Sequence, residues 1–206
     1  MTTPLQTVLH RAAALALGIG ALASGSALAE STYGYASSGT GTVTATARVN
    51  LSVTIPKLIL LRVGSANTVV DTLSWTSTYS IPATPTVPVA GNNTAVSWDA
   101  NAPTVTAGTQ PTALSVTAWT NAGAGTINCS VATWSPATGG PLNSNFTITS
   151  TGTLPHPGAN LGACASTSFP SNSLASSTWA YQLGGTPSAW TAGAYSTVVT
   201  YTATGV

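Results

Sequence analysis

The clearest pattern in the chain is a strict alternation of apolar and polar residues over residues 41–55. A period of two is typical of a β-strand with one buried face, and Pro56 ends the pattern. At about 3.3 Å per residue the segment would extend roughly 50 Å, whereas strands in globular domains seldom exceed about ten residues. The apolar positions of this predicted strand are Val43, Ala45, Ala47, Val49, Leu51, Val53 and Ile55.

Such a length leaves two interpretations of the predicted strand. In the first, it bends and contributes to both sheets of its own domain. In the second, part of it leaves the domain and completes the sheet of a neighbouring molecule, where main-chain hydrogen bonds provide affinity and alternating side chains fill pockets. The small residues Ala45 and Ala47 suit either a bend or shallow pockets, so both interpretations stay open from the pattern alone.

Shorter strand-like segments follow, separated by clusters of Gly, Pro, Asn and Ser. An apolar run at residues 57–64, with a cation near each end, is consistent with a buried strand. Short strands with turn signals between them predict an all-β, antiparallel sandwich. The further predicted strands are residues 68–75, 94–98, 111–119, 126–131, 145–149, 178–183 and 194–204.

The first 29 residues have the three parts of a secretory signal: a positive charge at Arg11, an apolar stretch over residues 12–23, and small residues before Glu30. The apolar stretch is too short to span a bilayer, which needs about 20 residues. We therefore expect a cleaved signal helix at residues 1–29, a polar arm at 30–39 and one domain at 40–206. The expected location is extracellular or at the cell surface, reached through the periplasm in a Gram-negative cell, with no membrane span in the mature chain.

Charge is nearly absent: 4 Lys and Arg residues stand against 3 Asp and Glu residues, and 37 Thr and 24 Ser residues supply most of the polar surface. The mature chain, which lacks Arg11, would have no net charge. Electrostatic repulsion between copies would then be weak, which favours self-association. Nucleic-acid binding is not expected, because neutralising phosphates requires clustered Lys and Arg.

The residues that usually carry catalysis are scarce. Asp71 and Asp99 are isolated acids next to strand residues, and His156 is a single imidazole between two prolines. These residues cannot provide a pair of catalytic carboxylates, a catalytic triad or a cluster of metal ligands. We expect no enzyme activity, no cofactor and no metal. With so few titrating groups, stability should vary little between about pH 5 and pH 9, and His156 is the first group able to change that.

Two cysteines, Cys129 and Cys164, allow a single disulfide pairing, which an exported protein favours. The bridge would close a loop of about 36 residues and stabilise the fold by roughly 3 to 4 kcal/mol. A metal site or a reactive thiol would need a nearby His or further Cys, which the sequence does not provide.

The 6 tryptophans suggest a second use of the surface. Aromatic faces can stack on sugar rings, and Trp134 and Trp190, which border loops rich in Gly and Pro, are the candidate glycan contacts. The alternative is that these side chains fill the core, as large aromatic residues do in many sandwiches.

The segment at residues 192–204, where a Gly turn leads into alternating aromatic and hydroxyl residues, resembles the last strand of bacterial immunoglobulin-like surface and fimbrial subunits. The resemblance implies an immunoglobulin-like sandwich that polymerises through exchanged strands, as in a pilus. Val43, Ala45, Ala47, Val49 and Leu51 would then match the donor strand, and residues 195–201 the closing strand.

The sequence thus favours a structural subunit of an extracellular filament, sheath or surface matrix. Its partners would be further copies of itself or other surface subunits, joined by strand exchange through residues 41–55. The alternative is a secreted carbohydrate-binding or adhesin module that uses surface tryptophans and takes a glycan as its partner.

Overall fold

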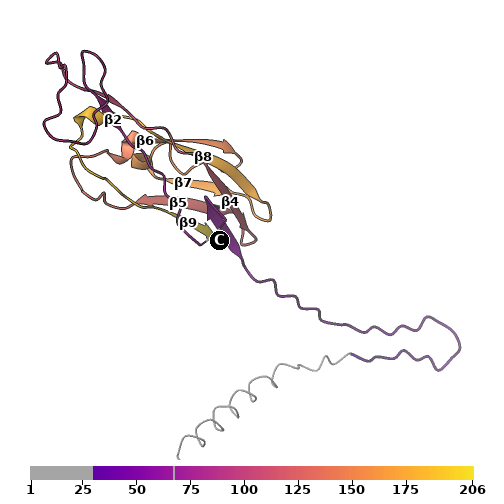
Figure 1. Ribbon diagram of the computed structural model, residues 1–206. Helices are drawn as coiled ribbons and strands as arrows, with labels where there is room; N and C mark the ends of the chain where they lie inside the picture. The colour runs from indigo at the N-terminus through magenta and orange to yellow at the C-terminus, as the bar shows by residue number, and fades with distance from the viewer. Residues whose placement is uncertain (1–29, 67) are drawn as a thin grey trace, which may run out of the picture. The chain divides into compact units, whose positions relative to one another are not determined.

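The computed structural model describes residues 30–66 and 68–206 (Figure 1). The predicted secretory signal at residues 1–29 lies outside the described residues. The chain divides into two compact units, Met1–Ile55 and Pro56–Val206. None of the helices in the described part is both long enough and apolar enough to cross a bilayer.

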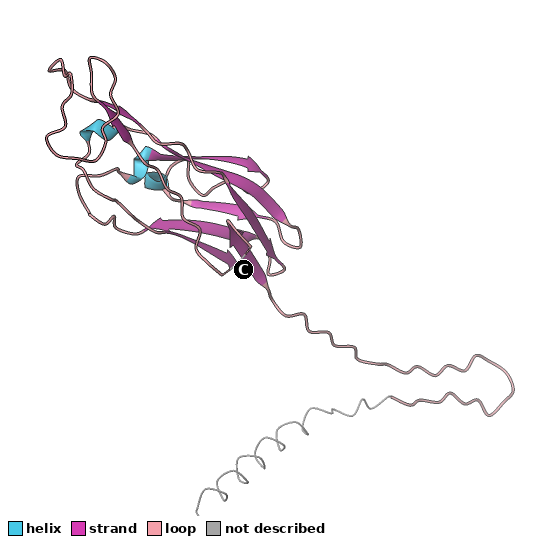
Figure 2. Cartoon of the chain, viewed as in Figure 1, coloured by secondary structure: helices cyan, strands magenta, loops and turns pink. Residues whose placement is uncertain are grey.

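The unit Pro56–Val206 is all-β, and its paired strands are antiparallel (Figure 2). One sheet has four strands in the order β1-β4-β8-β6, a second has the order β7-β5-β9, and β2 and β3 form a small two-stranded sheet. Three short 3-10 turns occur at Asn143–Asn145, Leu161–Ala163 and Pro187–Ala189. The strands are β1 (Ile59–Val63), β2 (Thr78–Ser80), β3 (Thr104–Thr106), β4 (Leu114–Thr120), β5 (Gly125–Val131), β6 (Phe146–Gly152), β7 (Ser166–Phe169), β8 (Ala175–Leu183) and β9 (Val199–Gly205).

Most of the shorter predicted strands are confirmed, because β1, β4, β5, β6, β8 and β9 overlap the predicted segments. The predictions at residues 68–75 and 94–98 are wrong. Leu73 and Trp75 do pack against the core, but no neighbouring strand pairs with their backbone among the described residues. Residues 94–98 are exposed and make only an isolated bridge at Trp98, since they bury no apolar face.

Both larger sheets contribute to one hydrophobic core. At its centre the side chain of Trp179 is 0% exposed, and its indole N–H donates to the carbonyl of Leu154 over 2.9 Å. Alternate residues of β8 point into the core, which explains why its period-two pattern was readable from the sequence. The other buried members are Val116, Ala118, Ile127, Phe146, Ile148, Leu154, Leu161, Phe169, Ala175 and Tyr181.

The predicted disulfide between Cys129 and Cys164 is confirmed, with the two Cα atoms 5.4 Å apart. Cys129 lies in β5, and Cys164 lies in the connection between β6 and β7. The bond therefore fastens this long connection to the three-stranded sheet.

Residues 41–55 do not form the predicted half-buried strand. No strand is assigned there and every residue is exposed, with Leu51 at 89% and Val53 at 84%. Within this unit the chain doubles back on itself, because Thr32 Oγ1 donates to the carbonyl of Thr46 over 2.8 Å. A strand is stabilised by a paired neighbour and a covered face, and the described residues provide neither here. Among the described residues, this segment therefore does not bend to pair with both sheets of its own domain, as the first interpretation required.

Candidate functional site

The edge strands β1 and β9 lie close together but belong to different sheets. Their inward side chains are only half-buried, whereas the inward side chains of the central strands, such as Val116 and Ile127, are fully buried. No strand of the described residues pairs with the outer edge of either one. We call the following six residues the open seam: Ile59, Leu61 and Val63 of β1, and Val199, Tyr201 and Ala203 of β9.

At the opposite side of the four-stranded sheet, the connection between β6 and β7 covers part of the outer edge of β6. There the N–H of Ile148 in β6 donates to the carbonyl of Ala159 over 3.0 Å, and Thr147 forms a bridge with Asn160. The disulfide holds the same connection against β5. The outer edge of β6 is therefore partly covered by its own chain, whereas no described strand pairs with the outer edges of β1 and β9 at the seam.

The outer face of β1 adds apolar surface beside the seam. Leu60 is 55% exposed, and Leu58, just before the strand, is also exposed. Exposed apolar edge strands offer unpaired N–H and C=O groups to another chain, and natural proteins usually protect them with charge or cover. Arg62 is the one charged residue of β1, so the protection of this edge is slight.

Behind the seam, Tyr201 joins a buried chain of hydrogen bonds. Nδ1 of His156 lies 2.6 Å from the carbonyl oxygen of Gly158, and because a carbonyl only accepts, Nδ1 carries the proton. The backbone nitrogen of Gly158 also lies 3.1 Å from Nδ1. With the proton on Nδ1, the N–H of Gly158 has no lone pair there to which it can donate. Nε2 then accepts from the hydroxyl of Tyr201 over 2.7 Å, and the hydroxyl of Tyr201 accepts from that of Tyr181.

This chain links both sheets to the connection between β6 and β7, since Tyr181 lies in β8 and Tyr201 in β9. His156 is only 8% exposed and packs edge-on against Trp179 with ring centroids 4.8 Å apart. Burial lowers the pKa of His156, and the hydrogen bond with Gly158 opposes that effect. Burial also raises the pKa of both tyrosines, so their hydroxyls stay protonated. An imidazole between two prolines was the one sign of this cluster that could be read from the sequence.

The buried His156 is expected to make the domain less stable in acid. Its folded-state pKa lies below the ordinary value of 6.5, so below that pH the unfolded chain binds more protons than the folded one. We expect full stability above about pH 6.5 and a progressive loss as the pH falls towards the folded-state pKa. This departs from the nearly flat profile that the composition suggests between about pH 5 and pH 9.

Urea unfolding at a series of pH values between 8 and 5 measures this effect, with His156→Gln as the control. Glutamine cannot titrate, so its profile should be flatter than that of the wild type over the same range. Equal slopes for the two proteins would show that His156 does not control the acid response.

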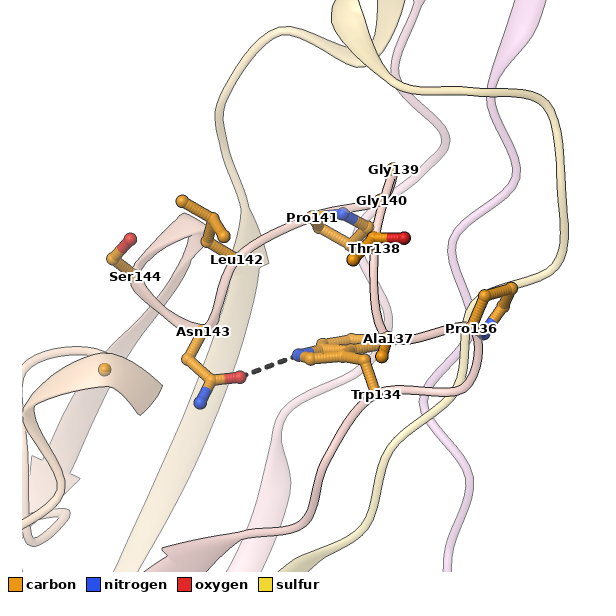
Figure 3. A pocket seen from close by; sticks show the side chains of 11 residues that line it. Trp134, Pro136, Ala137, Thr138, Gly139, Gly140, Pro141, Leu142, Asn143 and Ser144 are labelled. Atoms are coloured by element: carbon orange, nitrogen blue, oxygen red, sulfur yellow. Dashed lines mark hydrogen bonds between the residues drawn. The ribbon is translucent and has the colours of Figure 1, made fainter.

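The two candidate glycan contacts lie in different surroundings. Trp134 stacks on Phe146 with ring centroids 5.3 Å apart, and its indole N–H donates to Oδ1 of Asn143 over 2.7 Å. Its ring forms part of an open hollow of about 670 Å³, beneath the loop that carries Gly139 and Gly140 (Figure 3). Trp190 is half-buried after the turn at Pro187–Ala189 and does not line this hollow.

Among the described residues one tryptophan is strongly exposed, Trp98 at 60%, and it was not one of the two candidate glycan contacts. Its indole N–H donates to the carbonyl of Asn101. Since the indole N–H groups of both Trp98 and Trp134 are already bonded within the protein, neither offers a free donor to a sugar hydroxyl.

The two acids of the domain act within turns. Asp71 accepts from the N–H of Ser65, and Asp99 accepts from the backbone and side chain of Asn101, which lowers the pKa of Asp99. Among the described residues, no three His, Cys, Asp or Glu side chains gather as metal ligands would.

Comparison with known proteins gives no match: no family model, no curated protein and no solved structure resembles the chain. The features of the molecule that bear on its function are therefore the exposed segment at residues 41–55 and the open seam.

Proposed function

We propose that this protein is a secreted structural subunit of an extracellular filament, sheath or surface matrix, assembled when residues 41–55 of one copy enter the open seam of the next. The observation that carries the proposal is the segment itself, whose alternating apolar side chains are all exposed. The same chain contains an apolar seam with which no strand of the described residues pairs. A heterologous, head-to-tail contact of this kind builds an open chain of subunits when the rotation between copies does not close a ring.

The strand order supports the proposal that the seam accepts a further strand. In an immunoglobulin-like sandwich one sheet has the order A-B-E-D and the other C-F-G. If β1, β4, β6 and β8 correspond to A, B, D and E, the first sheet matches, and β5 and β9 correspond to C and F. No strand of the described residues occupies the position of G beside β9, and that position borders the open seam.

The side-chain pattern of the segment suits that vacant position. A strand inserted between β1 and β9 must present an apolar residue to the core at every second position, as residues 41–55 do. Burying Val49, Leu51, Val53 and Ile55 would contribute about 6 kcal/mol or more before the cost of association is subtracted. The near absence of charge leaves little repulsion between copies.

A test of this function compares two substitutions on opposite faces of the segment, in the mature chain of residues 30–206. Val53→Asp places a charge on the apolar face, and the neighbouring Ser52→Asp places the same charge on the polar face. We expect wild type and Ser52→Asp to form polymers by sizing and electron microscopy, and Val53→Asp to lower the assembled fraction at least about tenfold. A wild-type protein that stays monomeric at high concentration, or equal effects of the two charges, would contradict the proposal.

A second candidate function is a secreted carbohydrate-binding or adhesin module, favoured by the open hollow beside Trp134. In that case the wild type would bind on a glycan array as a monomer, and Trp134→Ala would abolish binding. The indole N–H already bonded to Asn143 weighs against it.

A further inference from the structure

The side-chain amide of Asn121 holds the first three residues of the domain. The last pair of the β1–β4 ladder is Ile59 with Thr120, and Asn121 follows directly. Its Oδ1 accepts from the N–H of Leu58 over 2.7 Å, and its Nδ2 donates to the carbonyl of Pro56 over 2.8 Å. Its backbone N–H also donates to the carbonyl of Leu58 over 3.2 Å. The amide therefore acts like an added residue of β4 and keeps residues 56–58 in line with β1.

This arrangement bears on which seam residues 41–55 can fill. Because the segment directly precedes β1, it could enter the seam of its own domain only by running antiparallel beside β1. To bring the end of the segment that carries Val53 and Ile55 into that seam, the chain would have to reverse direction within residues 56–58. Hairpin loops of two to five residues are common, so the length of the connection permits such a reversal. The three hydrogen bonds of Asn121 oppose it, because a reversing chain must break them.

We propose that Asn121 is a positioning residue that selects strand exchange between copies over closure of a single copy on itself. The inference rests on the proposed function, since it assumes that residues 41–55 fill the seam. On this proposal, the side-chain amide of Asn121 determines whether the protein polymerises or remains a monomer whose own segment fills its seam.

The test uses Asn121→Ala in residues 30–206, with the exposed loop residue Asn92→Ala as the matched control. We expect Asn121→Ala to lower the assembled fraction several-fold and to give a monomer that melts at a higher temperature than the wild-type monomer. Loss of a merely structural contact would lower the melting temperature instead. Adding Val53→Asp to Asn121→Ala should remove the increase in melting temperature, because the segment can then no longer fill the seam.

Asn121→Asp gives an intermediate case, since a carboxylate can accept from Leu58 but cannot donate to Pro56. We expect its assembled fraction to lie between those of the wild type and Asn121→Ala. If Asn121→Ala assembles as the wild type does, or if its monomer melts at a lower temperature, the role of Asn121 is overturned while the proposed function stands. If the wild type itself never assembles, both are overturned.

Discussion

Trp179→Ala is expected to lower the free energy of unfolding of the domain by about 4 kcal/mol or more. The side chain is fully buried, and removing a buried tryptophan costs about 3 to 5 kcal/mol in transfer energy and cavity formation. The carbonyl of Leu154 would also lose its indole donor, and the imidazole of His156 would lose the ring it packs against. Since domains of this size are stable by only about 5 to 15 kcal/mol, much of the variant should be unfolded or loosely packed.

Trp98→Ala is the matched control, because it makes the same substitution at an exposed position. Urea unfolding followed by circular dichroism should show a change of at most about 1 kcal/mol for this control. Similar losses for the two variants would mean that the core does not centre on Trp179.

Removal of the disulfide, by the double substitution Cys129→Ala and Cys164→Ala, is expected to cost about 4 kcal/mol. The two residues are 35 positions apart, and closing a loop of that length restricts the unfolded chain by about this amount. In the folded chain the bond fastens the connection that carries His156 and covers the outer edge of β6.

Urea unfolding of the double variant beside the wild type with and without a reducing agent measures this contribution. The reduced wild type should unfold at the same urea concentration as the variant, well below the oxidised protein. If all three unfold together, the bond contributes nothing to stability.

The local patterns of the sequence predicted the central strands because those strands have one face in the core. The alternation in β8 and β9 and the apolar run around β1 reflect this burial directly. In contrast β7, with the sequence STSF, and the short β2 and β3 bury few apolar residues. Their pairing depends on neighbours far away in the sequence, which local periodicity does not reveal.

The strongest pattern in the sequence, at residues 41–55, is also the one that the structure leaves unpaired. Alternation records which face a strand buries, but it does not say in which molecule the burial takes place. The candidate site shows the same limit. The disulfide followed from counting cysteines, whereas the hydrogen bonds that join His156 to Tyr201 of β9, and Tyr201 to Tyr181 of β8, needed the folded chain.

The most direct test of the central claim is hydrogen exchange of the backbone amides in residues 41–55, measured in assembled wild-type protein and in the Val53→Asp monomer. Strand exchange predicts that these amides are slowed at least about a hundredfold in the assembly and exchange as fast as an unstructured chain in the monomer. Equally fast exchange in both samples would contradict the account.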